Sequence, residues 1–217
     1  MTAVTMPNGR PQPARDEAEL ASLVAARLCH DLVSPLGAIG NGVELLEMSG
    51  DFPGISKSPE LALITESVRA ARARVRFFRT AFGHASPDQR VAVSEIGQLM
   101  ADFTAGGRLT VELDGSGDVS RPEARMILLA LMCMDSAMPW GGRVLVCRTG
   151  NGWRLVGEAS RTRFEPASWS WLDHRPEAPP QMPVAAEVHF AMLGVLAARN
   201  DRPIAWEVDA SGGEITF

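Results

Sequence analysis

The sequence has only three cysteines, a single lysine and no long uninterrupted apolar run. Cys29, Cys133 and Cys147 form no CxxC pair and lie among apolar neighbours, which predicts core thiols in a reducing compartment. No stretch approaches the roughly 20 apolar residues that cross a bilayer, and the N-terminus lacks a basic segment followed by an apolar run. We therefore expect a cytoplasmic protein with no membrane segment and no sensor of its own.

Nearly all the positive charge comes from arginine, because Lys57 is the only lysine among 21 basic residues, and the formal net charge is -5. The arginines are interleaved with acids except along residues 69–79, so nucleic acid is not the expected partner. Those exceptional arginines fit either a solvated face or a surface that attracts an acidic partner. They are Arg69, Arg72, Arg74, Arg76 and Arg79.

Two apolar stripes at helical spacing follow residues 1–15, whose proline-rich, polar composition predicts a disordered tail. A helical pattern begins at residue 16, breaks at 50–54, and resumes where Ser58 and Pro59 supply an N-cap and a first-turn proline. The stripes predict a helical hairpin over 16–84, and two hairpins packed as a four-helix bundle would cover them, so we expect a homodimer. The first stripe is Cys29, Leu32, Leu36, Ile39, Val43 and Leu46, and the second is Leu61, Ile64, Val68, Ala71, Val75, Phe78 and Phe82.

From about residue 91 the pattern changes to short alternating elements, which predicts a second domain over 91–217 and an α+β fold class. A glycine-rich turn at 150–152 indicates a β-hairpin, and five prolines make 166–183 too broken for regular structure. We expect helices at 94–103, 122–138 and 185–199, and strands at 109–113, 143–146, 153–158, 204–208 and 214–217.

The stretch CHDLVSPLGAI, residues 29–39, carries the most chemical information. At 100° per residue, His30 is turned away from the stripe that holds Cys29 and toward solvent. Pro35 removes one helical hydrogen bond and frees the carbonyl of Asp31, at a cost of about 3 kcal/mol in an ordinary helix. An exposed histidine beside such a break indicates a functional site.

HDLVSPLGAI resembles the H box of histidine kinases, in which a histidine, an acid, an apolar residue and two further residues precede Pro-Leu. His30, Asp31, Pro35 and Leu36 occupy the four defining positions. The resemblance implies that His30 is the phosphoacceptor, and an imidazole with a pKa of about 6.5 suits a nitrogen nucleophile. Asp31 could orient or deprotonate the ring, or pair with an arginine. Ser34 could position water or an acyl phosphate, or bond the carbonyl one turn back.

The order of elements over 91–217 also resembles a reduced form of the ATP-binding domain of those kinases. Where that family has an asparagine, this chain has Cys133 or Asp135, and residues 158–160 read Glu-Ala-Ser in place of an Asp-x-Gly-x-Gly loop. DGSG at 114–117 has the wrong spacing and is predicted to be a turn. With no P-loop, nucleophile elbow or zinc motif, we expect no cofactor, no bound metal and no ATP-dependent kinase activity.

A kinase-like hairpin joined to a degenerate ATPase-like domain is similar, over residues 16–217, to the ChpT-type histidine phosphotransferases of alphaproteobacterial cell-cycle phosphorelays. That resemblance implies a homodimer which takes a phosphoryl group from the receiver of a hybrid kinase onto His30 and passes it to response-regulator receivers, which supply the aspartate and Mg²⁺. Two alternatives are an active kinase core and a purely structural dimerisation module. We expect His84, His174 and His189 to be incidental.

Overall fold

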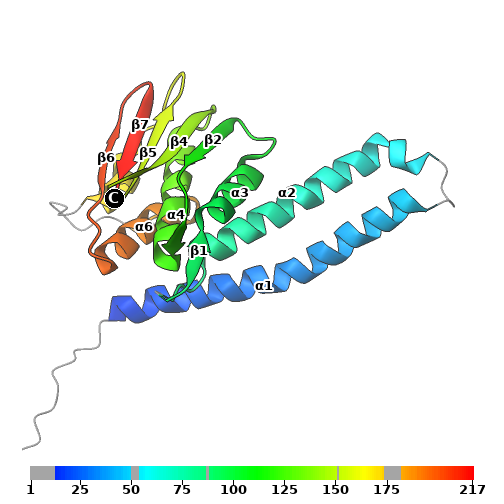
Figure 1. Cartoon of the computed structure of the whole chain (residues 1–217), viewed down its shortest axis with the longest axis horizontal. Helices are drawn as coiled ribbons and strands as arrows, with labels where there is room; N and C mark the ends of the chain where they lie inside the picture. Colours follow the sequence, from blue (N-terminus) through cyan, green and yellow to red (C-terminus); the bar gives the residue numbers. More distant parts are fainter. Residues whose placement is uncertain (1–12, 50–53, 87, 151, 174–181) are drawn as a thin grey trace, which may run out of the picture.

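The computed structural model has an α+β fold in which an N-terminal helical hairpin precedes a sheet-containing domain (Figure 1). It describes residues 13–49, 54–86, 88–150, 152–173 and 182–217. The predicted fold class is therefore confirmed. The first twelve residues of the predicted tail lie outside the described residues, and the first helix begins at Pro13, three residues before the predicted start.

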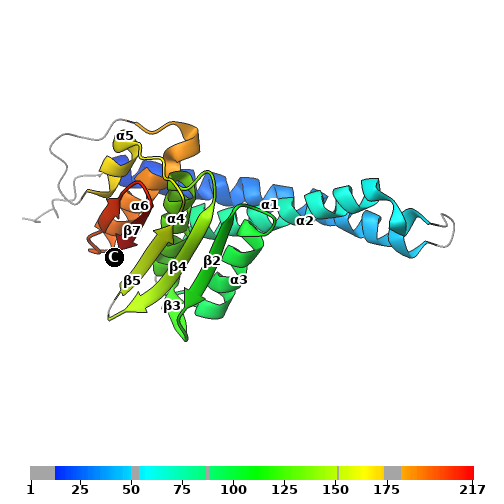
Figure 2. The ribbon, with the colours of Figure 1, turned by 90° about the horizontal axis from the view of Figure 1, so that it is seen from above.

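The hairpin consists of α1 (Pro13–Met48), a short 3-10 turn η1 (Ile55–Lys57) and α2 (Pro59–Phe82). The start of α2 is the predicted one, since the Ser58 hydroxyl accepts a hydrogen bond from the Leu61 amide at 3.3 Å. Because α1 has 36 residues and α2 has 24, α1 continues past the C-terminal end of α2 (Figures 1 and 2). A Cβ built on Gly83, just after α2, would lie 4.0 Å from the Ala26 side chain, which marks where that end falls along α1.

The two predicted apolar stripes are buried on one flank only. Cys29 and Val43 of α1, with Leu61 and Val75 of α2, are buried where the two helices meet. Other members of the stripes are exposed in the single chain. These are Leu32 at 50%, Ile39 at 50%, Leu46 at 39% and Ile64 at 46%.

The last turns of α2 belong to the core of the second domain. Phe77 is fully buried and stacks on Phe103, with ring centroids 4.0 Å apart. Phe78 and Phe82, which the sequence pattern assigned to the hairpin stripe, pack against that same core. The assignment was wrong for these two rings because α2 runs against the helices of the second domain before it ends.

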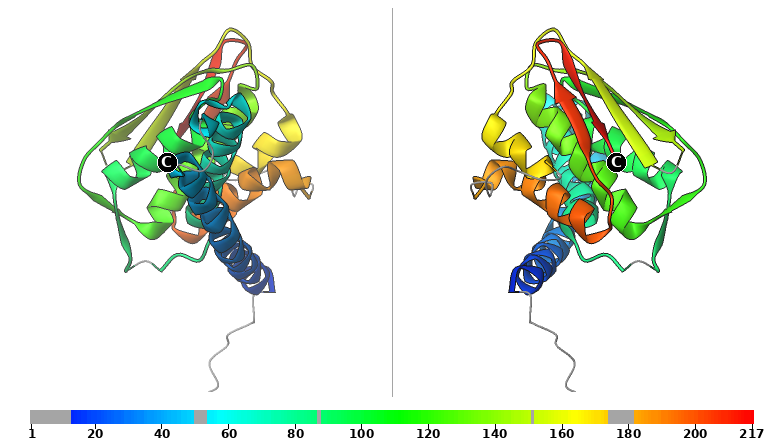
Figure 3. Two further views of the ribbon diagram at one scale, coloured as in Figure 1. Left: turned by 90° about the vertical axis from the view of Figure 1, so that its right-hand side faces the viewer. Right: turned by 90° about the vertical axis from the view of Figure 1, so that its left-hand side faces the viewer.

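The second domain is a five-stranded sheet with helices α3, α4 and α6 on one face (Figure 3). The strand order is β2-β4-β5-β7-β6, in which β2 and β4 are parallel and the other pairs are antiparallel. The elements are β1 (Arg90–Ala92), α3 (Val93–Thr104), β2 (Leu109–Asp114), β3 (Asp118–Ser120), α4 (Arg121–Ala137), β4 (Gly142–Thr149), β5 (Gly152–Glu158), α5 (Pro166–Trp169), η2 (Ser170–Leu172), η3 (Ala185–Glu187), α6 (Val188–Arg199), β6 (Ala205–Val208) and β7 (Gly212–Thr216).

The predicted helices and strands are all present, with two corrections. The sequence pattern missed the small antiparallel pair β1–β3, in which each strand has three residues. It was also wrong to deny regular structure to the whole proline-rich segment, since Pro166 occupies the first turn of α5, where its missing amide costs nothing. Of that segment, residues 174–181 lie outside the described residues.

Ala21–Met48 of α1 is long and apolar enough, by length and composition alone, to cross a membrane. The expectation that no stretch approaches this length was therefore wrong. It looked for uninterrupted apolar residues, whereas Arg27, His30, Asp31 and Asn41 interrupt the apolar side chains of α1. Only 6% of the apolar window is buried in the single chain.

Candidate phosphotransfer site

His30 lies on α1 one residue after Cys29, and the two side chains face opposite environments. Cys29 is 8% exposed against α2, whereas the His30 side chain is 81% exposed. The helical period produces this difference because consecutive side chains are separated by 100° around the axis. The imidazole is therefore open to a partner protein.

Asp31 contacts that imidazole at Nδ1. Its Oδ1 lies 3.3 Å from His30 Nδ1, and its Oδ2 accepts a hydrogen bond from Arg27 Nε at 2.8 Å. The hydrogen bond with His30 is the largest cause of a lowered pKa at the Asp31 carboxyl, and the bond and charge of Arg27 lower it further. Because a carboxylate only accepts, this contact is a hydrogen bond in the tautomer that carries the proton on Nδ1, and in that tautomer Nε2 keeps its lone pair.

The structure shows both contacts that the sequence offered for Asp31, since the same carboxylate lies against the imidazole and pairs with an arginine. Sequence reasoning did not single out Arg27, although its spacing of four residues from Asp31 was a usable signal. The Arg27 side chain is 76% exposed. An ion pair this exposed adds little stability.

Ser34 and Pro35 follow one turn after His30 and Asp31. The Ser34 side chain is exposed. Pro35 lies inside α1, and the helix continues through it. Since proline has no amide hydrogen, the Asp31 carbonyl loses its helical donor and α1 is locally weaker at this point. Leu36 is half-buried toward α2.

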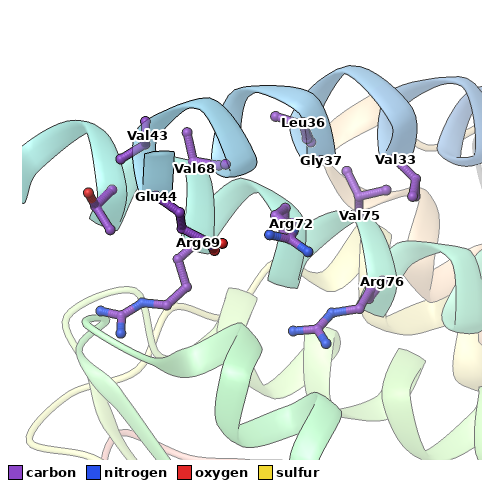
Figure 4. Close-up of a pocket in the computed structure, with 12 residues that line it drawn as sticks. Val33, Leu36, Gly37, Val43, Glu44, Val68, Arg69, Arg72, Val75 and Arg76 are labelled. Carbon is purple, nitrogen blue, oxygen red and sulfur yellow. The ribbon is translucent and has the colours of Figure 1, made fainter. Parts of the chain in front are cut away.

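A groove between α1 and α2 begins on the same turns of α1 (Figure 4). Its cavity volume is about 410 Å³, with an apolar floor and three arginines from α2 along one side. Arg76 also donates to Asp102 of α3 at 2.9 Å. The apolar lining is Val33, Leu36, Val43, Val68 and Val75, the arginines are Arg69, Arg72 and Arg76, and Glu44 of α1 lies near Arg69.

Glycines on α1 give this groove its depth. A side chain at Gly40 would come within 3.0 Å of the Arg72 guanidinium, whereas one at Gly37 would meet nothing within 4 Å. Glycine inside a helix costs roughly 1 kcal/mol relative to alanine. The open space beside Gly37, two turns from His30, is therefore a surface on which another backbone can approach α1 closely.

The positions that sequence reasoning examined for nucleotide binding are filled or acidic. Cys133 is fully buried, and the side chains of Met134 and Met138 pack directly against Gly157 of β5. Beside the end of α4 lies a hollow of about 330 Å³. It is lined by Asp135, Glu165 and Glu187, with Arg163 as its one positive side chain. A polyphosphate would meet three carboxylates there.

Of the other histidines, the structure describes His84 and His189. His189 is buried, lies 3.0 Å from the Ser136 hydroxyl, and has its pKa lowered to about 4 by burial. His84 is exposed after the end of α2, and His174 is outside the described residues. Within the described ranges, no group of three or more histidine, cysteine or acidic side chains is arranged to hold a metal ion.

Comparison with known proteins agrees with the class that this fold and histidine define. Residues 93–212, more than half of the chain, match the family model for the histidine phosphotransferase C-terminal domain. The protein phosphotransferase ChpT of Brucella abortus is 31% identical over 148 residues, which cover 67% of this chain and 65% of that relative. The chain therefore belongs to the histidine phosphotransferase family.

One solved structure shares the fold over almost the entire length. A bacterial phosphotransferase aligns with 98% of this chain and 99% of its own, with a TM-score of 0.64 at 21% identity. A histidine kinase domain from Erythrobacter litoralis aligns less closely, with 88% of this chain and 92% of its own, at a TM-score of 0.46 and 12% identity.

Proposed function

We propose that this chain is a phosphorelay intermediate in which His30 accepts a phosphoryl group from the aspartyl phosphate of one receiver domain and passes it to the aspartate of another. The observation that carries the proposal is an exposed imidazole whose Nδ1 is held by Asp31, which leaves Nε2 free as the nucleophile. Membership of the histidine phosphotransferase family supports the reaction class.

The chemistry needs no cofactor on this chain. The His30 Nε2 lone pair attacks phosphorus, a P–N bond forms, and the P–O bond to the donor carboxylate breaks. In the second transfer an oxygen of the acceptor aspartate attacks phosphorus and the P–N bond breaks, which returns the electron pair to Nε2. The positive charge that develops on the ring is stabilised by Asp31. The receivers supply Mg²⁺ beside their own aspartate.

A transfer assay with a phosphorylated receiver tests this proposal. His30→Gln should lose phosphate acceptance completely, because no nucleophile remains, while circular dichroism stays unchanged, because the side chain is 81% exposed. Asp31→Asn should slow transfer by about 10²-fold, the low end of the contribution of a positioned acid–base group. His84→Gln is the matched exposed control and should transfer at the wild-type rate. Phosphate acceptance by His30→Gln would place the phosphoacceptor elsewhere.

An active kinase core is the second candidate, and the second domain argues against it. Met134 and Met138 occupy the space next to Gly157, and the neighbouring hollow is acidic. We therefore expect no heat of ATP binding in calorimetry with Mg²⁺. Binding in the micromolar range would favour the kinase.

We infer that the exposed flank of α1 pairs with a second copy of the chain. Val24, Leu28, Leu32, Ile39 and Leu46 are each at least 39% exposed and share one side of α1 by helical spacing. Two such stripes bury each other in a four-helix bundle, which also accounts for the apolar character of Ala21–Met48 without a membrane. The three free thiols support a cytoplasmic location.

A further inference from the structure

Arg125 of α4 joins three helices through a buried guanidinium. The residue is 7% exposed. Its Nε donates to the Ala81 carbonyl at 3.1 Å, and its Nη2 donates to the Phe82 carbonyl and to the Ser22 hydroxyl, each at 3.4 Å. Ala81 and Phe82 are the last residues of α2, and Ser22 lies on α1.

The end of α2 is a favourable place for this charge. The last carbonyls of a helix have no helical partner and carry the negative end of its dipole. Burial is the largest cause that lowers the pKa of Arg125, to about 10, so the guanidinium is still protonated at neutral pH. Burying the charged guanidinium of Arg125 costs free energy, and its hydrogen bonds to the end of α2 and to the side of α1 offset that cost.

Ser22 lies on the part of α1 that α2 does not cover. The end of α2 falls beside Ala26, so residues before 26 form an arm that extends beyond the hairpin (Figure 1). One bond from Arg125, donated by Nη2, holds this arm at Ser22. His30 follows Ser22 by eight residues, or about 12 Å along the axis.

Pro35 gives α1 a place to bend, C-terminal to both this arm and His30. The helical hydrogen bond to the Asp31 carbonyl is missing there, and proline is the commonest cause of a helix kink. His30 thus lies on a stretch of α1 with a weak point at Pro35 and two contacts that oppose a bend there, the burial of Cys29 against α2 and the bond at Ser22. With the Ser22 bond removed, the packing of Cys29 is left to oppose a bend at Pro35, and the direction of the imidazole becomes less fixed.

We propose that Arg125 is a positioning residue for His30: by tying Ser22 to the end of α2, it stops the N-terminal arm of α1 from pivoting at Pro35. The role in transfer rests on the proposed function of His30. The mechanical part does not, so the two can fail separately.

Hydrogen exchange on the full-length protein tests the mechanical part. Arg125→Met keeps the apolar stem but removes all three donated bonds, and we expect the amides of residues 22–30 to exchange about tenfold faster, with residues 38–46 unchanged. Arg108→Met, at an exposed arginine of the same domain, is the control and should exchange as wild type. Adding Pro35→Ala to Arg125→Met restores the missing helical bond and should slow exchange over 22–30 again. Wild-type exchange there in Arg125→Met, or no recovery with Pro35→Ala, overturns the proposal.

Transfer kinetics test the positioning part. In Arg125→Met we expect the rate at saturating receiver to fall about tenfold, as small errors in geometry do, while the half-saturating receiver concentration changes less than twofold. Arg125→Lys keeps the charge and should recover part of the rate. A change confined to the half-saturating concentration would overturn a positioning role.

Two further outcomes remain decisive. If Arg125→Met is not cooperatively folded, Ser22→Ala is the variant to use, because it removes only the contact on the arm. It should still speed exchange over residues 22–30. Wild-type exchange there in Ser22→Ala overturns the proposal. If wild-type His30 accepts no phosphate, the proposed function fails, while the exchange result still decides whether Arg125 restrains the arm.

Discussion

The two regions of this molecule differ most in what surrounds their central helices. In the second domain, 12 of the 17 residues of α4 are buried, and Ile127, Leu128 and Leu129 are fully enclosed. In the hairpin, α1 buries Cys29 and Val43 but leaves Leu28 59% exposed. The second domain encloses its core within one chain, whereas the hairpin leaves an apolar flank exposed in the single chain. This is the flank that the proposed dimer would cover.

The largest effect on the free energy of unfolding should come from a cavity in the core of the second domain. Leu129→Ala should lower the free energy of unfolding by about 2–5 kcal/mol, because it leaves a cavity in a closed environment. Leu63→Ala on α2, where the side chain is 65% exposed, should change it by less than about 0.5 kcal/mol. Urea unfolding measures both. Similar losses in the two variants would show that the hairpin is as closely packed as the second domain.

A charge on the exposed flank of α1 probes the hairpin side of the comparison. Leu32→Asp should convert the proposed dimer to a monomer in light scattering, since an unpaired charge in a dry interface costs about 3–5 kcal/mol. Leu63→Asp is the matched control on α2. Circular dichroism of both should stay helical. A Leu32→Asp protein with wild-type mass would mean that this flank is not the contact between copies.

A third prediction uses pH to separate a buried histidine from an exposed one. The pKa of His189 is lowered to about 4 in the folded protein, whereas the unfolded value is about 6.5. The unfolded state therefore binds more protons below pH 6.5, and stability falls as the pH drops toward 4, by about 3 kcal/mol in total. His189→Gln should remove this part of the slope in urea unfolding between pH 7 and pH 4. His30→Gln in the hairpin should keep it, and an unchanged slope in His189→Gln would contradict the assignment.

The elements of the second domain were predictable because each has its own periodic pattern and turn. In the hairpin, Ser58 and Pro59 predict the start of α2 through the ordinary chemistry of a helix N-terminus. The side on which Phe78 and Phe82 pack was not predictable, since a stripe at spacings of three and four does not say which neighbour covers it. The β1–β3 pair was also not predicted, because strands of three residues are too short to show an alternation of apolar and polar side chains.

For the candidate site, the outward orientation of His30 and the break at Pro35 followed from helical geometry and from the chemistry of proline. Arg27 could have been found from its spacing to Asp31. Arg125 could not, because its acceptors Ala81 and Ser22 are distant in sequence and two of its three acceptors are backbone carbonyls. The position of such a donor is decided by tertiary packing.

In the proposed function, the high exposure of His30 also determines how long a phosphoryl group can be stored on it. Enzymes protect reactive intermediates by closing a site against water, but the imidazole here is 81% exposed. The lifetime of the phosphorylated protein is then set by the intrinsic hydrolysis of the P–N bond and by how soon an acceptor arrives. Such a carrier does not stay phosphorylated for long after its donor is exhausted. Its phosphorylated fraction follows the ratio of the rate of phosphoryl transfer from donors to the rate of transfer to acceptors.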